Sequence, residues 1–117
     1  MLFSDSNSFS LMIGGTGSDR LVGHAGSDIL VAGTTDHDDD DAALCAIMAQ
    51  WSSSADYNIR VAAISALLNS ATVHDDGAED TLTGAAGLDL FFANLSGGSV
   101  LDKITDNHDA ELAFDET

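Results

Sequence analysis

A nine-residue repeat near the start of the chain constrains its fold more than any other feature. Residues 14–22 read GGTGSDRLV, and residues 23–31 follow directly as GHAGSDILV. Each copy has a glycine-rich half, an aspartate at its sixth position and then a triplet with an apolar residue in the middle. A repeat this short cannot bury an apolar face alone, so we expect the repeats to stack into a coil.

The repeat returns after an interruption, between residues 75 and 99. Asp80 and Asp89 lie nine residues apart, and each is followed two positions later by a large apolar residue, Leu82 or Phe91. The apolar position recurs in phase along both segments, at Phe3, Met12, Leu21 and Leu30 in the first and at Val73, Leu82, Phe91 and Val100 in the second. We therefore predict an apolar core stripe along the coil.

The interruption has a helical pattern. Apolar residues recur at helical spacing in two groups, Leu44, Ile47, Met48 and Trp51, and then Tyr57, Val61, Ile64 and Leu68. This spacing predicts two short amphipathic helices. The aspartate run 38–41 stands where the first helix would begin, so one of its carboxylates can cap free N–H groups while its neighbours favour the positive end of the helix. Ser53, Ser54 or Asp56 can cap the second helix.

The net negative charge of the chain limits the classes of partner that it can bind. Its 117 residues include 20 acidic and 3 basic side chains, for a formal net charge of −17. Such a surface repels nucleic acid and anionic membranes, and its crowded carboxylates oppose compaction unless a cation neutralises them. No run is apolar for long enough to span a membrane, and the N-terminus lacks the basic cluster of a cleavable secretory signal. We therefore expect cations as partners, with neither nucleic acid nor membrane insertion.

Glycine and aspartate at these repeat positions suit a calcium site. Glycine reaches positive φ at little cost, so a glycine-rich half-repeat can curl tightly and aim backbone carbonyls at one point. Ca²⁺ takes about 6 to 8 oxygen ligands, more than one turn with one carboxylate can supply. Two stacked turns are needed, and the apolar triplets after the aspartates would form the short strands that stack them.

On these residues the chain resembles the RTX, or haemolysin-type, calcium-binding repeat family, over residues 11–35 and 75–93. Its order of repeats, alanine-rich helices and repeats is also similar to the C-terminal region of large bacterial, planctomycete-like surface proteins. The resemblance implies a parallel β-roll with two repeats per turn, bound Ca²⁺, a secreted or cell-surface location and export by a type I system. The metal ligands that it implies are the side chains of Asp19, Asp28, Asp80 and Asp89 and backbone carbonyls around Gly14, Gly15, Gly17, Gly23, Gly26, Gly84 and Gly87.

Some repeats depart from the family pattern. His24 and Ala85 replace the second glycine of their repeats, and the turn before Asp80 has only Gly77. Because other residues reach positive φ at a higher cost, we expect distorted turns or weak sites at these positions. The first turn matches the pattern best.

In that family the ligating aspartates lie two repeats apart, so Asp19 needs a partner beyond the next repeat. One arrangement stacks the second repeat set on the first and places Asp19 near Asp80 and Asp28 near Asp89. The other completes a site locally in the segment 32–38, which contains a histidine between two aspartates. We favour stacking, because neither repeat set has enough turns to bury its own core.

The predicted fold is mainly β, a short parallel β-roll of the RTX type with an inserted α-helical hairpin. The single module 1–117 would comprise a first repeat set over 1–35, a helical insert over 36–71, a second repeat set over 72–99 and an irregular or antiparallel C-terminal cap over 100–117.

The predicted function is calcium binding coupled to folding, at the C-terminal end of a secreted or cell-surface bacterial protein. We expect no enzyme activity, because the sequence contains no nucleophile or cofactor motif. One alternative is an adhesion or protein-interaction module that uses the helical insert, with the roll as its scaffold. Another is the tail of a secreted hydrolase whose catalytic part lies elsewhere.

Overall fold

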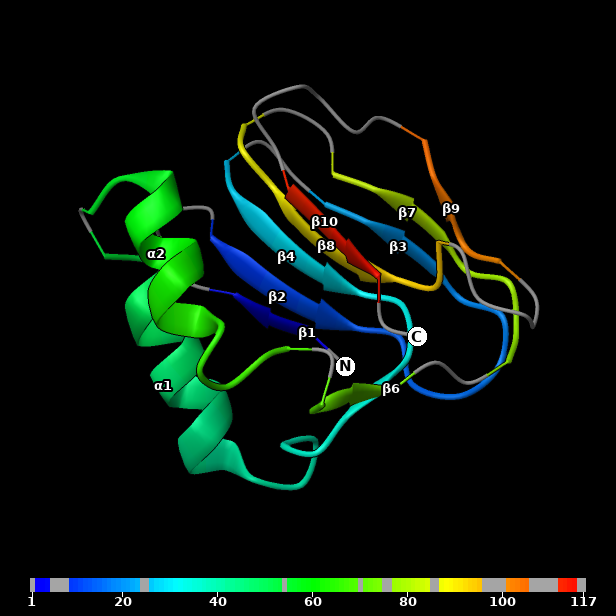
Figure 1. Cartoon of the computed structure of the whole chain (residues 1–117), viewed down its shortest axis with the longest axis horizontal. Helices are drawn as coiled ribbons and strands as arrows, with labels where there is room; N and C mark the ends of the chain where they lie inside the picture. Colours follow the sequence, from blue (N-terminus) through cyan, green and yellow to red (C-terminus); the bar gives the residue numbers. More distant parts are fainter. Residues whose placement is uncertain are drawn as a thin grey trace.

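The computed structural model describes residues 2–4, 9–23, 26–53, 55–69, 71–74, 77–84, 87–95, 101–105 and 112–115. These residues form three layers, in which a helical hairpin covers one face of a five-stranded sheet and a three-stranded sheet covers the other (Figure 1). The described residues contain both strands and two α-helices, so the fold is mixed α and β. The prediction of a mainly β chain is therefore confirmed only in part.

The strands form two large sheets and one small one. The five-stranded sheet has the order β1 (Leu2–Ser4), β2 (Ser10–Ile13), β4 (Asp28–Val31), β8 (Leu90–Ala93) and β10 (Leu112–Asp115). The three-stranded sheet has the order β3 (Arg20–Val22), β7 (Thr81–Thr83) and β9 (Lys103–Ile104). Neighbouring strands in both are parallel, except that β1 is antiparallel to β2. The short strands β5 (Thr34–Thr35) and β6 (Val73–His74) form an antiparallel pair at the base of the helical hairpin.

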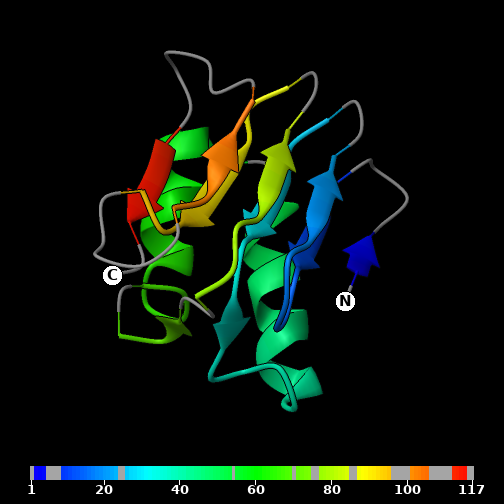
Figure 2. The same cartoon turned by 90° about the vertical axis from the view of Figure 1, so that its right-hand side faces the viewer.

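The chain coils between the two large sheets, because β2, β3 and β4, and later β7 to β10, alternate between them (Figure 2). Met12 pairs with Leu30, so the first turn spans 18 residues, or two repeats. The next turn contains the helical hairpin and spans 61 residues in both sheets, from Leu21 to Leu82 and from Leu30 to Phe91. The predicted stacking of the second repeat set on the first is thereby confirmed.

The five-stranded sheet is buried on both faces, because alternate side chains of its central strands enter two different cores. The core between the two sheets consists of Met12, Leu30, Ala32, Leu82, Phe91 and Ala93, with Leu21, Ile104 and Ala113 packed against it. Most of the predicted stripe therefore lies in this core. Val73 is an exception and packs in the core beneath the helices, because β6 belongs to the hairpin base. The side chain of Phe3 and all of Val100 lie outside the described residues.

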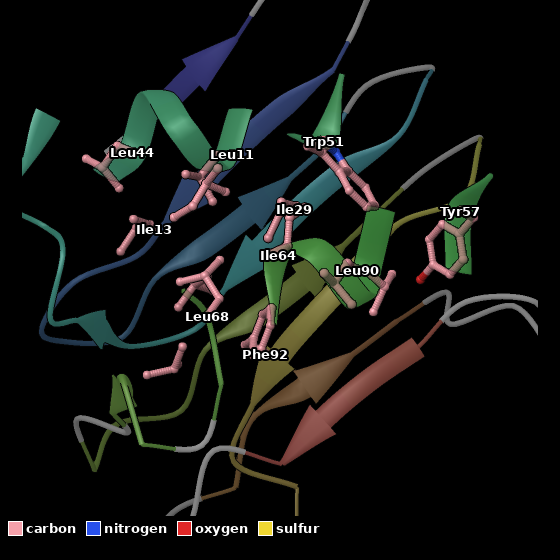
Figure 3. Packing of buried hydrophobic residues seen from close by; sticks show 14 residues of the cluster. Leu11, Ile13, Ile29, Leu44, Trp51, Tyr57, Ile64, Leu68, Leu90 and Phe92 are labelled. Carbon is pink, nitrogen blue, oxygen red and sulfur yellow. The ribbon is translucent and has the colours of Figure 1, made fainter. Parts of the chain in front are cut away.

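Both predicted helices are confirmed, as α1 (Asp41–Trp51) and α2 (Tyr57–Ile64), although α2 ends before Leu68, the last apolar residue of the predicted pattern. The carboxylate of Asp40 caps α1 by accepting a hydrogen bond from the N–H of Ala43 at 3.2 Å. The apolar faces of the helices meet side chains of the sheet, among them Leu11, Ile29, Leu90 and Phe92 (Figure 3). No described helix is long and apolar enough to cross a membrane.

The expectation of an irregular or antiparallel cap over 100–117 is wrong for its described residues. β9 pairs in parallel with β7, and β10 pairs in parallel with β8, so the coil continues for a further turn. The physical reason is that Asp102 is followed two positions later by Ile104, which packs against the core between the sheets as Leu82 and Phe91 do. The segment still forms the C-terminal edge of both sheets.

Candidate metal centre

Two rows of polar side chains stand where the chain enters the strands. Row A consists of Ser10, Asp28 and Asp89, at or directly before the starts of β2, β4 and β8. Row B consists of Asp19, Asp80 and Asp102, directly before β3, β7 and β9. The four carboxylates predicted from the sequence are thus brought together as two pairs, Asp19 with Asp80 and Asp28 with Asp89.

Each row is linked from turn to turn by hydrogen bonds to carboxylates. In row B, the N–H of Asp19 donates to Oδ1 of Asp80 at 2.5 Å, and the N–H of Asp80 donates to Oδ1 of Asp102 at 2.8 Å. In row A, the N–H of Asp28 donates to Oδ1 of Asp89 at 2.8 Å, and the serine hydroxyl donates to Oδ1 of Asp28. Charge-assisted bonds of this kind are about twice as strong as neutral ones. They fix one oxygen of each accepting carboxylate.

The other carboxylate oxygen faces the glycine that opens the same turn. A Cβ atom on Gly14 would lie 2.9 Å from Oδ2 of Asp19, and one on Gly84 would overlap Oδ2 of Asp89. Gly23 stands in the same relation to the aspartate of its own turn. The first repeat position is therefore glycine because the carboxylate occupies the space that a side chain would need.

The fourth repeat position bends the chain back toward the aspartate. Gly17, Gly26 and Gly87 have φ values of 87°, 108° and 95° there, in the region that glycine adopts at low cost. In the turn before Asp80 an alanine holds the fourth position, and Gly77, one residue earlier, has a positive φ of 75°. Distortion of this turn, or weakness of its site, stays a prediction.

Three further repeat positions were singled out from the sequence, and the structure describes one of them. Gly15 has φ 84°, and its N–H donates to the carbonyl of Gly33 at 2.9 Å, which ties the first turn to the turn stacked on it. His24 and Ala85, where weak sites were expected, lie outside the described residues.

The rows concentrate negative charge in the interior. Three of their carboxylates are fully buried, those of Asp28, Asp80 and Asp89. The basic side chains lie elsewhere, because Arg20 and Lys103 are exposed and Arg60 donates to the carbonyl of Trp51 at 2.8 Å. Buried carboxylates are costly unless hydrogen bonds and a cation or a proton compensate for their lost hydration. The hydrogen bonds alone do not neutralise the negative charge of the two rows.

Asp19 is the clearest candidate ligand. Its Oδ2 atom is buried and has no hydrogen-bond partner among the described residues. Because β3 is the edge strand of its described sheet, no earlier strand of that sheet stacks against the Asp19 turn. The Oδ2 atoms of Asp80 and Asp89 are buried as well. A buried carboxylate oxygen that faces a glycine curl fits a hard cation such as Ca²⁺.

Sequence reasoning missed Asp102. Its Oδ1 accepts the N–H of Asp80 and its Oδ2 accepts the N–H of Asn94, both at 2.8 Å, so Asp102 links three segments of the chain. The signal was present in residues 97–104, which read GGSVLDKI and place aspartate sixth and an apolar residue eighth. The spacing hid it, because Asp102 follows Asp80 by 22 residues rather than by two repeats.

The alternative metal site within residues 32–38 is not formed, although the structure describes this whole loop. The carboxylate of Asp38 accepts bonds from the N–H and the hydroxyl of Thr35, and Nε2 of His37 lies 2.8 Å from a backbone carbonyl. Asp36 instead pairs with His74 at 2.7 Å across β5 and β6, at the surface. Within the described ranges, no three His, Cys, Asp or Glu side chains are grouped so that they could hold a metal. An ion between the stacked turns would therefore depend largely on backbone carbonyls.

Comparison with protein-family models, curated proteins and solved structures found no match for this chain. Membership of the RTX family therefore stays a prediction that rests on the repeat residues.

Proposed function

We propose that this chain is a calcium-binding module, a short β-roll of the RTX type that Ca²⁺ stabilises by binding between stacked turns. The observation that carries the proposal is the common register of the two sheets. A displacement of 61 residues sets Asp19 against Asp80 and also Asp28 against Asp89. The helical hairpin thus lengthens one turn of the coil and leaves the pairing of the repeats unchanged.

The ligands differ between the two rows. In row B, Asp19 and Asp80 would supply carboxylate oxygens, and the turn with Gly14, Gly15 and Gly17 would supply carbonyls. In row A, Asp28 and Asp89 would act with the turns that contain Gly23, Gly26, Gly84 and Gly87. Two features support the fit of a cation: Oδ2 of Asp19 is buried without a hydrogen-bond partner among the described residues, and glycine at the first repeat position leaves room for the carboxylates of Asp19, Asp28 and Asp89 inside their turns.

Calcium suits these turns better than magnesium does. Ca²⁺ accepts 6 to 8 oxygen ligands in irregular arrangements, and backbone carbonyls are common among them. Mg²⁺ requires an octahedron with shorter bonds and keeps several of its waters, so it binds poorly to a cage built mainly from carbonyls. The proposal therefore predicts selectivity for Ca²⁺.

The biological role would follow from linkage between binding and folding. An ion that binds only the folded state adds about 2.7 kcal/mol of stability at a concentration a hundred times its Kd. At low calcium, repulsion within the rows would favour the open chain, as suits export by a type I system. At millimolar calcium outside the cell, the module would fold at the C-terminal end of a secreted or cell-surface protein.

A calcium titration followed by circular dichroism tests the proposal. The chain is stripped with EDTA and titrated with Ca²⁺ or, in a parallel sample, with Mg²⁺. The proposal predicts a gain of β signal that saturates with Ca²⁺, and little change with Mg²⁺. If the EDTA-treated chain is already folded and equally stable in both titrations, hydrogen bonds to the carboxylates suffice and the proposal is wrong.

Use of the helical hairpin to bind a partner stays a prediction. The apolar side of the hairpin is buried against the sheet. On its outer side, the large apolar residue that stands exposed among the described residues is Ile59, at 59%. No specific observation favours this alternative.

A further inference from the structure

We infer that the helical hairpin is a clasp that closes over row A when calcium binds, and that calcium affinity therefore depends on side chains of the hairpin that never touch the ion. This inference rests on the proposed function and adds a regulator of the same site. The clasp consists of Trp51 at the end of α1 and Tyr57 and Arg60 in α2.

Two hydrogen bonds join the clasp to the backbone of row A. The indole N–H of Trp51 donates to the carbonyl of Ser27 at 2.8 Å, directly before Asp28. The hydroxyl of Tyr57 donates to the carbonyl of Asp89 itself at 2.6 Å. Both bonds are at least partly buried and reach residues that precede a strand. The hairpin thus holds the two turns whose carboxylates would share an ion.

Arg60 joins the two aromatic residues and extends the clasp to a third turn. Its guanidinium donates to the carbonyl of Trp51 and lies 4.6 Å from the ring of Trp51 and 5.9 Å from the ring of Tyr57. It also lies 5.4 Å from the ring of Phe9, which directly precedes Ser10 of row A. Burial lowers the pKa of this guanidinium and Tyr57 opposes the shift, but arginine stays protonated in proteins. The cation therefore holds three rings together at every working pH.

The clasp contacts three successive turns, at Phe9, Ser27 and Asp89, each at or directly before a residue of row A. In the absence of a cation, repulsion between Asp28 and Asp89 works to separate the turns that the clasp joins. An ion that holds these turns together also keeps both carbonyls at the positions where the clasp binds them. Because such coupling is reciprocal, a weakened clasp must weaken calcium binding.

The matched variants Tyr57→Phe and Ile59→Ala test the inference. Tyr57→Phe removes only the hydroxyl that binds Asp89, while Ile59 lies in the same helix with its side chain in solvent. We expect Tyr57→Phe to raise the Kd for Ca²⁺ about threefold to tenfold, the range for loss of one neutral hydrogen bond, and Ile59→Ala to leave it unchanged. Both are measured by calorimetry, with helix content in saturating Ca²⁺ checked by circular dichroism.

A second readout needs no variant. Trp51 is the single tryptophan of the chain and is fully buried, so its emission reports closure of the clasp. We expect its emission to shift to the blue with the same midpoint as calcium binding. Binding of Ca²⁺ by the wild type without any change in this emission, or with an unchanged Kd in a folded Tyr57→Phe variant, would overturn the inference and leave the proposed function standing. Absence of calcium binding to the wild type would overturn both.

Discussion

The backbone N–H of Asp19 donates a hydrogen bond of 2.5 Å to Oδ1 of Asp80, which lies 61 residues further along the chain. The equivalent bond in row A runs from the N–H of Asp28 to Oδ1 of Asp89. These bonds join the repeat sets across the helical hairpin. The two oxygens of Asp80 and of Asp89 therefore have different roles, since Oδ1 of each holds the register while Oδ2 of each is buried in its own turn.

Asp80→Asn separates these roles. The amide oxygen of asparagine can still accept the N–H of Asp19, but the charge that attracts a cation is lost. We predict that stability in EDTA is unchanged or rises by about 1–2 kcal/mol, because one buried charge is removed. The stability that an ion in row B contributes, about 2.7 kcal/mol at a hundred times the wild-type Kd of that site, should disappear, while the contribution of row A remains. Urea unfolding with EDTA and with Ca²⁺ measures both effects, and a variant that keeps the full gain would contradict the assignment of Asp80.

Asp102→Asn is the matched comparison within row B. Both oxygens of Asp102 accept backbone N–H groups, whereas asparagine offers one acceptor and places an NH₂ group against the other donor. We predict a loss of about 1–3 kcal/mol that is the same with and without Ca²⁺. Unfolding in urea under both conditions measures it. A loss seen only in calcium would show that Asp102 is also a ligand.

Two glycines with positive φ should respond differently to alanine. A Cβ atom at Gly87 would overlap the carbonyl of Gly26 in the stacked turn, while one at Gly15 would meet no atom within 4 Å. We predict a cost of about 2–4 kcal/mol for Gly87→Ala, from strain and overlap, and about 1 kcal/mol for Gly15→Ala, from strain alone. Thermal unfolding of both variants in Ca²⁺ checks the order. Equal losses would argue against the close stacking of these turns.

Removal of the helical hairpin tests whether it is an independent insert. Replacing residues 36–72 with an Asn-Gly turn would connect β5 directly to β6. This deletion exposes the sheet face that includes Leu11, Ile29 and Leu90, and each such side chain contributes about 1.5–3 kcal/mol when buried. We predict that the shortened chain does not fold even in Ca²⁺, as judged by circular dichroism and size-exclusion chromatography. A monomer that gains β structure with calcium would show that the hairpin is dispensable.

The repeats and helices were predictable because their periodicity is local. The apolar residues at Met12 and Leu30 point to one core, and the spacing within the insert points to two helices. The second core was missed, although its signal was present. Ile13 and Val31 flank the predicted stripe, and apolar residues on both sides of a strand indicate a sheet covered on both faces.

The candidate site was predictable in its residues and not in its hydrogen bonds. Aspartate at the sixth position could be read from the sequence, and so could the stacking of Asp19 on Asp80. Which carboxylate oxygen accepts an N–H depends on how the stacked turns approach each other, and this is a tertiary property. The bonds from Trp51 and Tyr57 to row A were missed for the same reason, since a helical pattern shows only that these residues are buried.

Calorimetric titration of Ca²⁺ into the wild type and into the double variant Asp19→Asn/Asp80→Asn tests the central claim most directly. We predict that the wild type binds Ca²⁺ and that the double variant binds fewer ions, because row B has lost both carboxylates while row A keeps Asp28 and Asp89. Mg²⁺ at the same concentrations should give little heat. Identical calcium isotherms for the two proteins, or no calcium binding by the wild type, would contradict the account.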